Sequence, residues 1–225
     1  MAEDSTPYAA SILSAAFFSR SALEVAPELL NCRIVTDIDG DVVVLRITEV
    51  EAYLGVGEDP GSHAFRGRTA RNESMFLPGG ALYVYRSYGI HWCANVVTGA
   101  AGEASGVLLR AGEVVVGRDI AYARRVASGV VRRDIDLARG PGRLATSLGL
   151  SDRFDGSSLT ARGPVSIQLP TSDSVPSEVN VGRSTRTGVS GIGSHAEFRF
   201  YLKEDPTVSP HKPVRHEIMP ASAPD

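Results

Sequence analysis

Lysine is nearly missing from this chain of 225 residues, and its scarcity limits the chemistry that the chain can perform. All of its 23 basic residues except Lys203 and Lys212 are arginines. An enzyme that forms a Schiff base with its substrate needs an amine nucleophile, and lysine is the usual source. Both lysines lie near the C-terminus, outside the candidate site segments described below, so a covalent imine mechanism is not expected.

Cysteine and histidine are also few, and their spacing does not indicate a metal. Cys32 and Cys93 form no CxxC pair, which argues against a disulfide framework and a zinc finger. We expect both to be buried, reduced thiols. The five histidines show no HxxxH or similar spacing, so no metal site is predicted. The glycine-rich stretches match neither a P-loop nor a dinucleotide-binding fingerprint, so no cofactor is expected.

Long apolar runs and a strong excess of one charge are absent as well. No stretch approaches the roughly 20 apolar residues that a membrane span needs, so no membrane partner is expected. Glu3 and Asp4 stand where a signal peptide would carry basic residues, which predicts a cytoplasmic protein. The net charge of -3 gives no general attraction to nucleic acid, so any such surface must be a local patch.

The chain does contain enough apolar sequence for one core, because 43% of its residues are hydrophobic. Ser21 and Glu24 form a capping-box signature, and Asp39-Gly40 is a hairpin signal. The expected elements are a short helix around Ile12–Phe18, helices over 22–30, 114–127 and 143–148, and strands over 32–38, 41–51, 81–86, 92–98, 104–112, 165–169 and 197–202. Strands outnumber helices and follow one another directly, which favours a single α+β domain with a mostly antiparallel sheet and flanking helices.

Two segments outside these regular elements have distinct expectations. Residues 54–75 form a long polar loop, and loops of that length are usually functional. Five prolines stand from Pro206 onward, so we expect a folded domain over 1–205 and a flexible tail over 206–225.

Two short segments gather side chains suited to catalysis on a planar ligand. Side chains alternate along a strand, so Glu49, Glu51 and Tyr53 are expected on one face, beside the long loop. A carboxylate such as Glu51 can activate water there as a general base. The second segment, 82–95, carries three tyrosines, His91 and the single tryptophan. The alternatives are a solvated edge strand for the first segment and an aromatic core cluster for the second.

A carboxylate among flat rings suits a pocket that stacks a planar base and presents water to it. A purine extruded from a nucleic-acid duplex is such a ligand. Tyr88, before Gly89 at a strand end, is placed to act as a wedge between bases. Basic side chains able to meet phosphates are Arg66, Arg68 and Arg71 in the long loop and Arg143 at a helix start. Ordinary solvated arginines paired with nearby carboxylates are the alternative.

Several motifs occur together in the order known from one family: E-A-Y-L-G, E-D-P-x-S-H, R-x-R-T-x-R-N, L-Y-V-Y-x-x-Y-G, H-W-C-x-N-V-V, V-L-L-R-A, R-G-P-G-R-L and F-R-F-Y-L. The chain resembles, from about Phe18 to Leu202, the 3-methyladenine (alkyladenine) DNA glycosylases of the single-domain, antiparallel-sheet type. The resemblance implies a curved sheet and a base-excision repair enzyme. Such an enzyme flips alkylated or deaminated purines out of double-stranded DNA and hydrolyses the N-glycosidic bond to leave an abasic site.

The resemblance also implies roles for individual residues. Glu51 corresponds to the water-activating carboxylate, and Arg110 to an arginine close to it. Tyr53, His63 and Tyr85 correspond to residues that stack on the flipped base, and Asn95 to one that screens out normal purines. Tyr88 corresponds to the side chain that fills the gap in the DNA stack. Glu49 matches an acidic position to which no role is assigned. Thr185 and Thr187 flank Arg186 where the family more often has proline and an aliphatic residue.

Together these observations predict a monofunctional DNA glycosylase from a bacterium that acts as a monomer. Two other functions stay open: a protein that binds lesions without cleaving them, and a hydrolase of free nucleosides. The intact Glu51–Tyr53 motif argues against the first, and the wedge tyrosine with its basic segments argues against the second.

Overall fold

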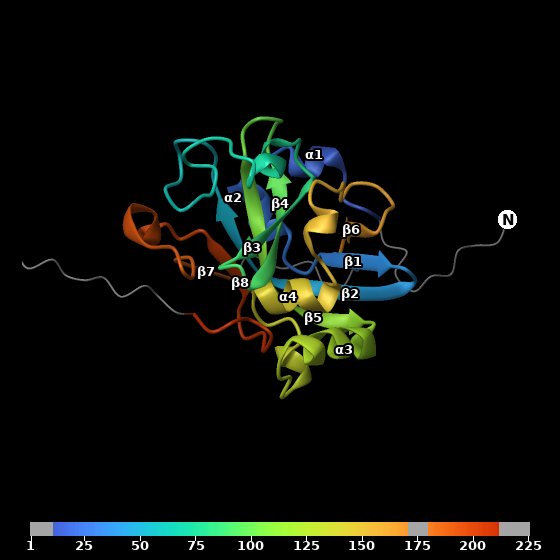
Figure 1. Cartoon of the computed structure of the whole chain (residues 1–225). Coiled ribbons are helices and arrows are strands. Elements are labelled where there is room, and N and C mark those ends of the chain that lie inside the picture. The colour runs from blue at the N-terminus through green and yellow to red at the C-terminus, as the bar shows by residue number, and fades with distance from the viewer. Residues whose placement is uncertain (1–10, 171–179, 212–225) are drawn as a thin grey trace, which may run out of the picture.

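One long strand, β2 (Asp41–Tyr53), organises the sheet in the computed structural model, which describes residues 11–170 and 180–211. Along one edge, β2 pairs first with β1 (Arg33–Ile38) and then with β8 (Arg199–Leu202), while β5 (Ser105–Val116) runs along the other edge. The remaining strands are β3 (Leu82–Ser87), β4 (His91–Thr98), β6 (Val165–Gln168) and β7 (Val181–Ser184). The strand order is β3-β4-β5-β2-β1-β6, with β7 paired to β8, and these pairs are antiparallel (Figure 1).

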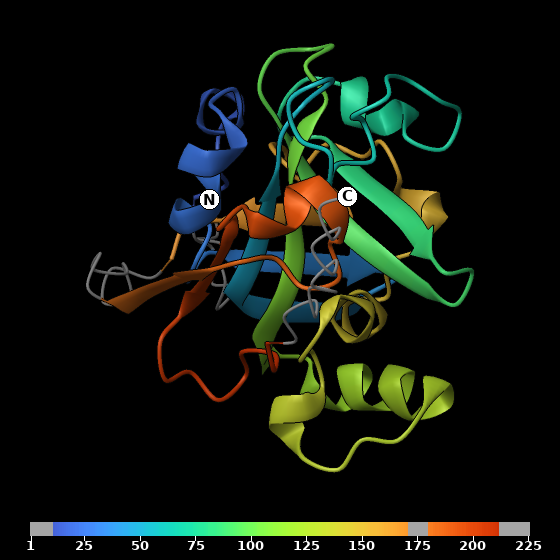
Figure 2. The ribbon, with the colours of Figure 1, turned by 90° about the vertical axis from the view of Figure 1, so that its left-hand side faces the viewer.

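Irregular pairing bends β2 where its acidic residues begin. The register between β2 and β5 shifts between Ile47 and Glu49 and again between Glu49 and Val50. Extra residues of this kind bend a strand and increase its twist, and they often re-aim side chains beside active sites. The sheet is therefore curled rather than flat, and the β3–β4 hairpin stands at one side of the molecule (Figure 2).

Within the described residues, four α-helices flank the sheet. Helix α2 (Ala22–Glu28) begins at the predicted capping box, in which Ser21 and Glu24 each accept a hydrogen bond from the other's backbone amide. It packs against β2 and β5. Helix α4 (Pro141–Leu148) packs against β4 and β5, and α3 (Arg118–Ser128) packs on α4. Helix α1 (Ala15–Phe18) is short. The core fills the space between sheet and helices, with Phe18, Leu30, Leu45, Leu109 and Leu144 fully buried.

The structure confirms the predicted α+β class and nearly all of the predicted elements, with three differences. Residues 114–116 were expected in a helix but continue β5, because they keep the two-residue alternation of a strand. Gly117, with φ of +73°, then separates β5 from α3. Helix α1 starts later than expected because Ile12 instead forms a β-bridge with Gln168. The short strand β7 was not predicted.

Residues 206–211, expected to begin a flexible tail, are packed against the domain. Thr207 and Ser209 are buried, and the hydroxyls of Thr207 and Thr48 lie 2.8 Å apart. Residues 212–225 lie outside the part of the chain that the structure describes. Among the described residues, no helix is both long and apolar enough to cross a membrane. Cys32 and Cys93 are free and buried, as predicted, and burial raises the pKa of the Cys32 thiol to about 12.

Candidate active site

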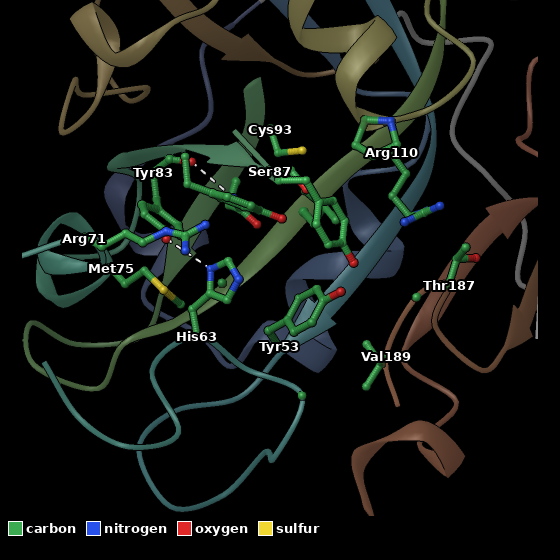
Figure 3. A pocket seen from close by; sticks show the side chains of 18 of the residues that line it. Tyr53, His63, Arg71, Met75, Tyr83, Ser87, Cys93, Arg110, Thr187 and Val189 are labelled. Atoms are coloured by element: carbon green, nitrogen blue, oxygen red, sulfur yellow. Dashed lines mark hydrogen bonds between the residues drawn. The ribbon is translucent and has the colours of Figure 1, made fainter. Parts of the chain in front are cut away.

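A pocket of about 570 Å³ lies beside the end of β2, within the size range of sites for small ligands (Figure 3). Most of its wall comes from four distant parts of the chain: the end of β2 with the long loop after it, the β3–β4 hairpin, β5, and residues 187–190 after β7. The lining includes Tyr53, His63, Arg71, Tyr85, Tyr88, Asn95 and Arg110. The fold thus brings every predicted substrate-binding residue to one cavity.

Aromatic rings form one side of the pocket. The rings of His63 and Tyr85 meet edge to face, with their centroids 4.5 Å apart. Tyr83 stacks on Tyr85 at 5.5 Å, with an interplanar angle of 25°. The hydroxyl of Tyr83 lies 3.1 Å from Nδ1 of His63. Tyr83 therefore contacts both rings and helps to fix them, a role that no sequence pattern predicted.

Glu51 lies directly behind the pocket wall. Its side chain has no exposed surface, yet three donors reach its carboxylate. The Tyr53 hydroxyl donates to Oε2 over 2.9 Å, Arg110 Nη1 donates to Oε2 over 3.1 Å, and the backbone amide of Thr187 donates to Oε1 over 2.7 Å. Each of these donors belongs to a residue that lines the pocket. Three residues of the pocket wall therefore hold the buried carboxylate in place behind the wall.

Tyr53 is held in place from its other side by Arg186. The Arg186 guanidinium lies 4.5 Å from the centre of the Tyr53 ring and is itself fully buried. It donates to Asp59 Oδ1 over 2.7 Å and to the Ala52 carbonyl over 3.0 Å. Burial raises the pKa of the Tyr53 hydroxyl well above its usual value, and the neighbouring Glu51 raises it further. Tyr53 therefore stays protonated and remains a donor to Glu51.

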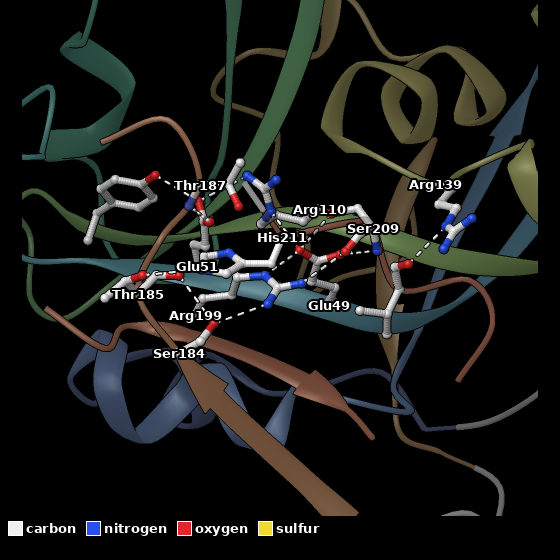
Figure 4. Close-up of polar contacts among 12 residues, drawn as sticks. Glu49, Glu51, Arg110, Arg139, Ser184, Thr185, Thr187, Arg199, Ser209 and His211 are labelled. Atoms are coloured by element: carbon white, nitrogen blue, oxygen red, sulfur yellow. Dashed lines mark hydrogen bonds and ion pairs between the residues drawn. The ribbon is translucent and has the colours of Figure 1, made fainter. Parts of the chain in front are cut away.

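Arg110 joins the two acidic residues of β2. Its Nε donates to Glu49 Oε1 over 2.8 Å, while Nη1 reaches Glu51 (Figure 4). Both carboxylates are fully buried, and the exposed fraction of Arg110 is 6%. The prediction that Glu49 and Glu51 share a face is confirmed by this common partner. A solvated edge strand, the alternative for this segment, does not fit their burial.

His63 and Asn95 occupy the rest of the predicted base-binding wall. Burial against the neighbouring rings lowers the pKa of His63, and the Arg71 guanidinium lowers it further. His63 is therefore neutral at neutral pH. Asn95 Nδ2 donates to the Tyr83 carbonyl over 3.2 Å, which fixes the orientation of the amide. The amide is buried and lines the pocket.

Of the residues expected to contact DNA, Tyr88 and Arg71 line the pocket. Tyr88 is 93% exposed at the tip of the β3–β4 hairpin. Its φ of +49° and that of Gly89 at +68° place two successive residues in the left-handed region. Arg71 lines the pocket and donates to the Arg86 carbonyl, while Arg66 and Arg68 are exposed in the loop. Arg143 borders a second hollow together with Val130, Arg132, Arg133 and Asp136.

Sequence similarity that extends well beyond the pocket residues identifies the family. Residues 16–206 match the family model described as methylpurine-DNA glycosylase (MPG). The chain belongs to the methylpurine-DNA glycosylase family.

Three relatives show how far the similarity to other methylpurine-DNA glycosylase family sequences extends. One from Streptomyces avermitilis is 46% identical over 211 residues, covering 94% of this chain and 94% of the relative. One from Leifsonia xyli subsp. xyli is 50% identical over 204 residues, covering 88% and 93%. One from Methanoculleus marisnigri is 42% identical over 197 residues, covering 88% and 98%. Each is described as a "Putative 3-methyladenine DNA glycosylase".

Several groups that support this candidate site could not be found by sequence reasoning. Asp59 and Arg186 are 127 residues apart in the chain and meet only in the fold. Thr187 contributes a backbone amide, which every residue type except proline would supply. Arg199 and Ser209 reach Glu49 from the end of the described chain. The signal available for Asp59 and Arg186 was their position inside or beside family motifs.

Proposed function

We propose that the protein is a monofunctional 3-methyladenine DNA glycosylase. It extrudes an alkylated or deaminated purine from double-stranded DNA and hydrolyses the N-glycosidic bond. The observation that supports this most directly is the position of Glu51, held by three donors behind a pocket walled by Tyr53, His63 and Tyr85. An aromatic slot selects a flat base, and a carboxylate beside it activates water.

In the proposed reaction, water attacks C1′ of the damaged nucleotide. Oε2 of Glu51 becomes accessible to that water when the Tyr53 hydroxyl turns away, and Glu51 accepts the proton as the new C1′–oxygen bond forms. The N-glycosidic bond breaks, and its electron pair stays with the purine. Alkylation at N3 or N7 leaves the purine positively charged, so the departing base becomes neutral without an acid. Arg110 holds the Glu51 carboxylate in place through its 3.1 Å hydrogen bond.

Selectivity is proposed to arise from stacking and from Asn95. An electron-deficient alkylated ring stacks more strongly on Tyr85 than a normal purine does. Neutral His63 does not repel a cationic base, whereas a protonated imidazole would. The Asn95 amide, fixed by its hydrogen bond to Tyr83, is proposed to exclude normal purines that carry an exocyclic amine.

The duplex itself is proposed to contact the pocket mouth. Tyr88 fills the gap that the extruded nucleotide leaves, offsetting part of the few kcal/mol that flipping costs. Arg66, Arg68, Arg71 and Arg143 are proposed to meet phosphates. This proposal is supported by the exposure of all four side chains and by the position of Arg71 in the pocket wall. The enzyme is proposed to act as a monomer on chromosomal DNA in the cytoplasm.

The deciding experiment is base release from a labelled duplex that holds one ethenoadenine or hypoxanthine, developed with hot alkali. Release of 3-methyladenine from alkylated DNA is measured beside it. Wild type is expected to release a base, and Glu51→Gln is expected to bind the lesion duplex without releasing it. Glu58→Gln is the matched control: it changes an exposed carboxylate in the loop after β2 and should behave as wild type.

Each alternative function has its own outcome in this assay. Tight lesion binding without release from any substrate would identify a binding protein. Turnover of free nucleosides, unchanged by Tyr88→Ala, would identify a nucleoside hydrolase. A borohydride-trapped covalent adduct with DNA would contradict the monofunctional mechanism, because it would show a Schiff base between the enzyme and the sugar. No such adduct is expected, since among the described residues no lysine lines the pocket.

A further inference from the structure

Behind the pocket wall, Glu49 accepts a set of buried hydrogen bonds although it does not line the pocket itself. Its Oε1 accepts from Arg110 Nε over 2.8 Å, from Arg199 Nε over 2.7 Å and from Ser209 Oγ over 2.9 Å. Its Oε2 accepts from the Ser209 backbone amide over 2.6 Å (Figure 4). A carboxylate with no exposed surface needs such partners, since an unpaired buried charge costs several kcal/mol.

The charges around Glu49 balance only when both carboxylates are ionised. Glu49 and Glu51 are fully buried, and the exposed fractions of Arg110 and Arg199 are 6% and 2%. Burial alone would raise the pKa of Glu49, but the charges of Arg110 and Arg199 outweigh burial and hold the pKa below its usual range. Two negative and two positive side chains therefore share one desolvated space, where charges act on each other more strongly than in water.

We infer that Glu49 is a positioning residue for excision: it fixes the guanidinium of Arg110 and balances the positive charge that faces the catalytic carboxylate Glu51. The inference rests on the proposed function of Glu51 as the base. Without Glu49, Arg110 would lose the partner of its Nε, and its direction toward Glu51 would no longer be set. Both arginines would then face a single carboxylate.

The C-terminal segment completes this arrangement from behind. Ser209 supplies two of the donors to Glu49, and its own carbonyl accepts from Arg199 Nη2 over 3.1 Å. Arg139 Nε donates to the Val208 carbonyl over 2.9 Å and holds the segment against the sheet. Residues 207–209 are thus a structural part of the catalytic centre, although they contact no substrate.

Loss of the Glu49 charge is expected to shift the pH dependence of the excision rate in one direction. The groups that act on Glu51 are Arg110 from β5, Tyr53 and Glu49 from β2, Arg199 from β8, and Arg186 and His211 from the segments packed beside them. With Glu49 neutralised, this group of side chains carries more positive charge, which disfavours the uptake of a proton at the site. The acid limb of the pH–rate profile should therefore move to lower pH.

The test compares Glu49→Gln, Glu49→Asp, Ser209→Ala and the control Glu113→Gln in the full chain. Glu113 is an exposed carboxylate of the same sheet, paired with Arg46. Single-turnover release of 3-methyladenine is measured against pH, together with the Kd for a lesion duplex and the thermal midpoint. We expect Glu49→Gln to release base roughly tenfold to hundredfold more slowly, with its acid limb at lower pH and its Kd unchanged.

The other variants separate the effect of the negative charge at residue 49 from the effect of its side-chain length. Glu49→Asp keeps the charge but is one methylene shorter, so it should be slow with an unshifted acid limb. Ser209→Ala should be slower than wild type, and Glu113→Gln should match wild type. A wild-type rate and profile in Glu49→Gln would overturn the inference. If Glu49→Gln does not fold, a wild-type rate in both Ser209→Ala and Glu49→Asp would overturn it instead. Absence of base release by wild type would refute the proposed function itself.

Discussion

At the scale of single residues, the protonation state of His63 matters because its ring lines the pocket in which we propose that a positively charged alkylpurine binds. The ring meets Tyr85 edge to face at 4.5 Å and lines the pocket. Burial and the Arg71 charge both lower the pKa of His63 below the usual value of 6.5. In the free enzyme His63 therefore stays neutral at any pH above this lowered pKa. A neutral imidazole and a cationic purine are compatible, whereas two cations in contact are not.

This gives a prediction for acid solution. As pH falls through the lowered pKa, His63 gains a proton, and KM for a cationic alkylpurine should rise. KM for the neutral lesion ethenoadenine should rise much less over the same range. Steady-state assays from pH 7.5 to 5 with both substrates check this, and His63→Gln, which cannot titrate, should remove the difference. Equal rises for the two substrates would contradict it.

At the scale of elements, the β3–β4 hairpin holds an aromatic residue in an unfavourable backbone conformation at its tip. Tyr88 has a positive φ, which costs a side chain with a Cβ about 1 kcal/mol, and its ring is almost fully exposed. Neither the positive φ nor the exposed ring stabilises the folded state. Strain kept at an exposed position is typical of functional sites.

Tyr88→Gly should therefore separate stability from activity. Glycine relieves the left-handed strain, so the thermal midpoint should stay equal or rise. Excision from duplex DNA should fall roughly tenfold if the wedge contributes about 1.4 kcal/mol. Tyr88→Phe, which keeps the ring, is the control and should stay near wild type. A Gly variant that cleaves duplex at the wild-type rate would exclude the wedge role.

The Arg186–Asp59 pair joins two loops that carry pocket residues. Both side chains are buried, and Arg186 also supports the ring of Tyr53. Breaking a buried pair leaves one charge uncompensated, so Asp59→Asn should lower the free energy of unfolding by about 3–5 kcal/mol. Glu28→Gln removes the exposed partner of Arg20 and should cost no more than about 1 kcal/mol. Urea denaturation of both variants gives the comparison, and equal losses would contradict it.

Local chemistry explains why most elements were predictable and a few were not. The Ser21–Glu24 capping box and the Asp39-Gly40 turn are properties of adjacent residues, so the sequence contains them fully. Residues 114–116 carry an apolar pattern too short to distinguish strand from helix, and pairing with β2 decided it. The packing of Ser209 depends on Glu49, far away in sequence, and prolines around it pointed to a tail instead.

At the scale of the whole molecule, a net charge of -3 means that DNA attraction must come from a restricted surface. Arg66 and Arg68 are exposed in the loop after β2, and Arg143 of α4 is exposed at the second hollow. Duplex affinity should fall steeply with salt, because each phosphate contact releases a counterion. Arg143→Gln should reduce the slope of log Kd against log salt by about 1. Arg153→Gln, which faces Asp39, should leave that slope unchanged.

The family motifs indicated which residues belong to the site but not how they are held. Motif order led to Glu51, Tyr53, His63, Tyr85, Asn95 and Arg110. The fold gathers five of them in one pocket wall and places Glu51 directly behind it, hydrogen-bonded to Tyr53 and Arg110. The supporting contacts from Asp59, Arg186, Arg199 and Ser209 span large sequence distances. Single-sequence patterns carry no information on such contacts, because they depend on tertiary packing alone.

The long sequence separation behind Glu49 has a consequence for how the enzyme is made. Arg199 and Ser209 are 150 and 160 residues from Glu49, so a ribosome synthesises Glu49, Glu51 and Arg110 well before the groups that close the space behind them. Contacts of such separation form slowly. A nascent chain can therefore form much of its sheet before Glu49 has its full set of partners. The proposed excision should reach its full rate only after β8 and residues 207–209 have docked.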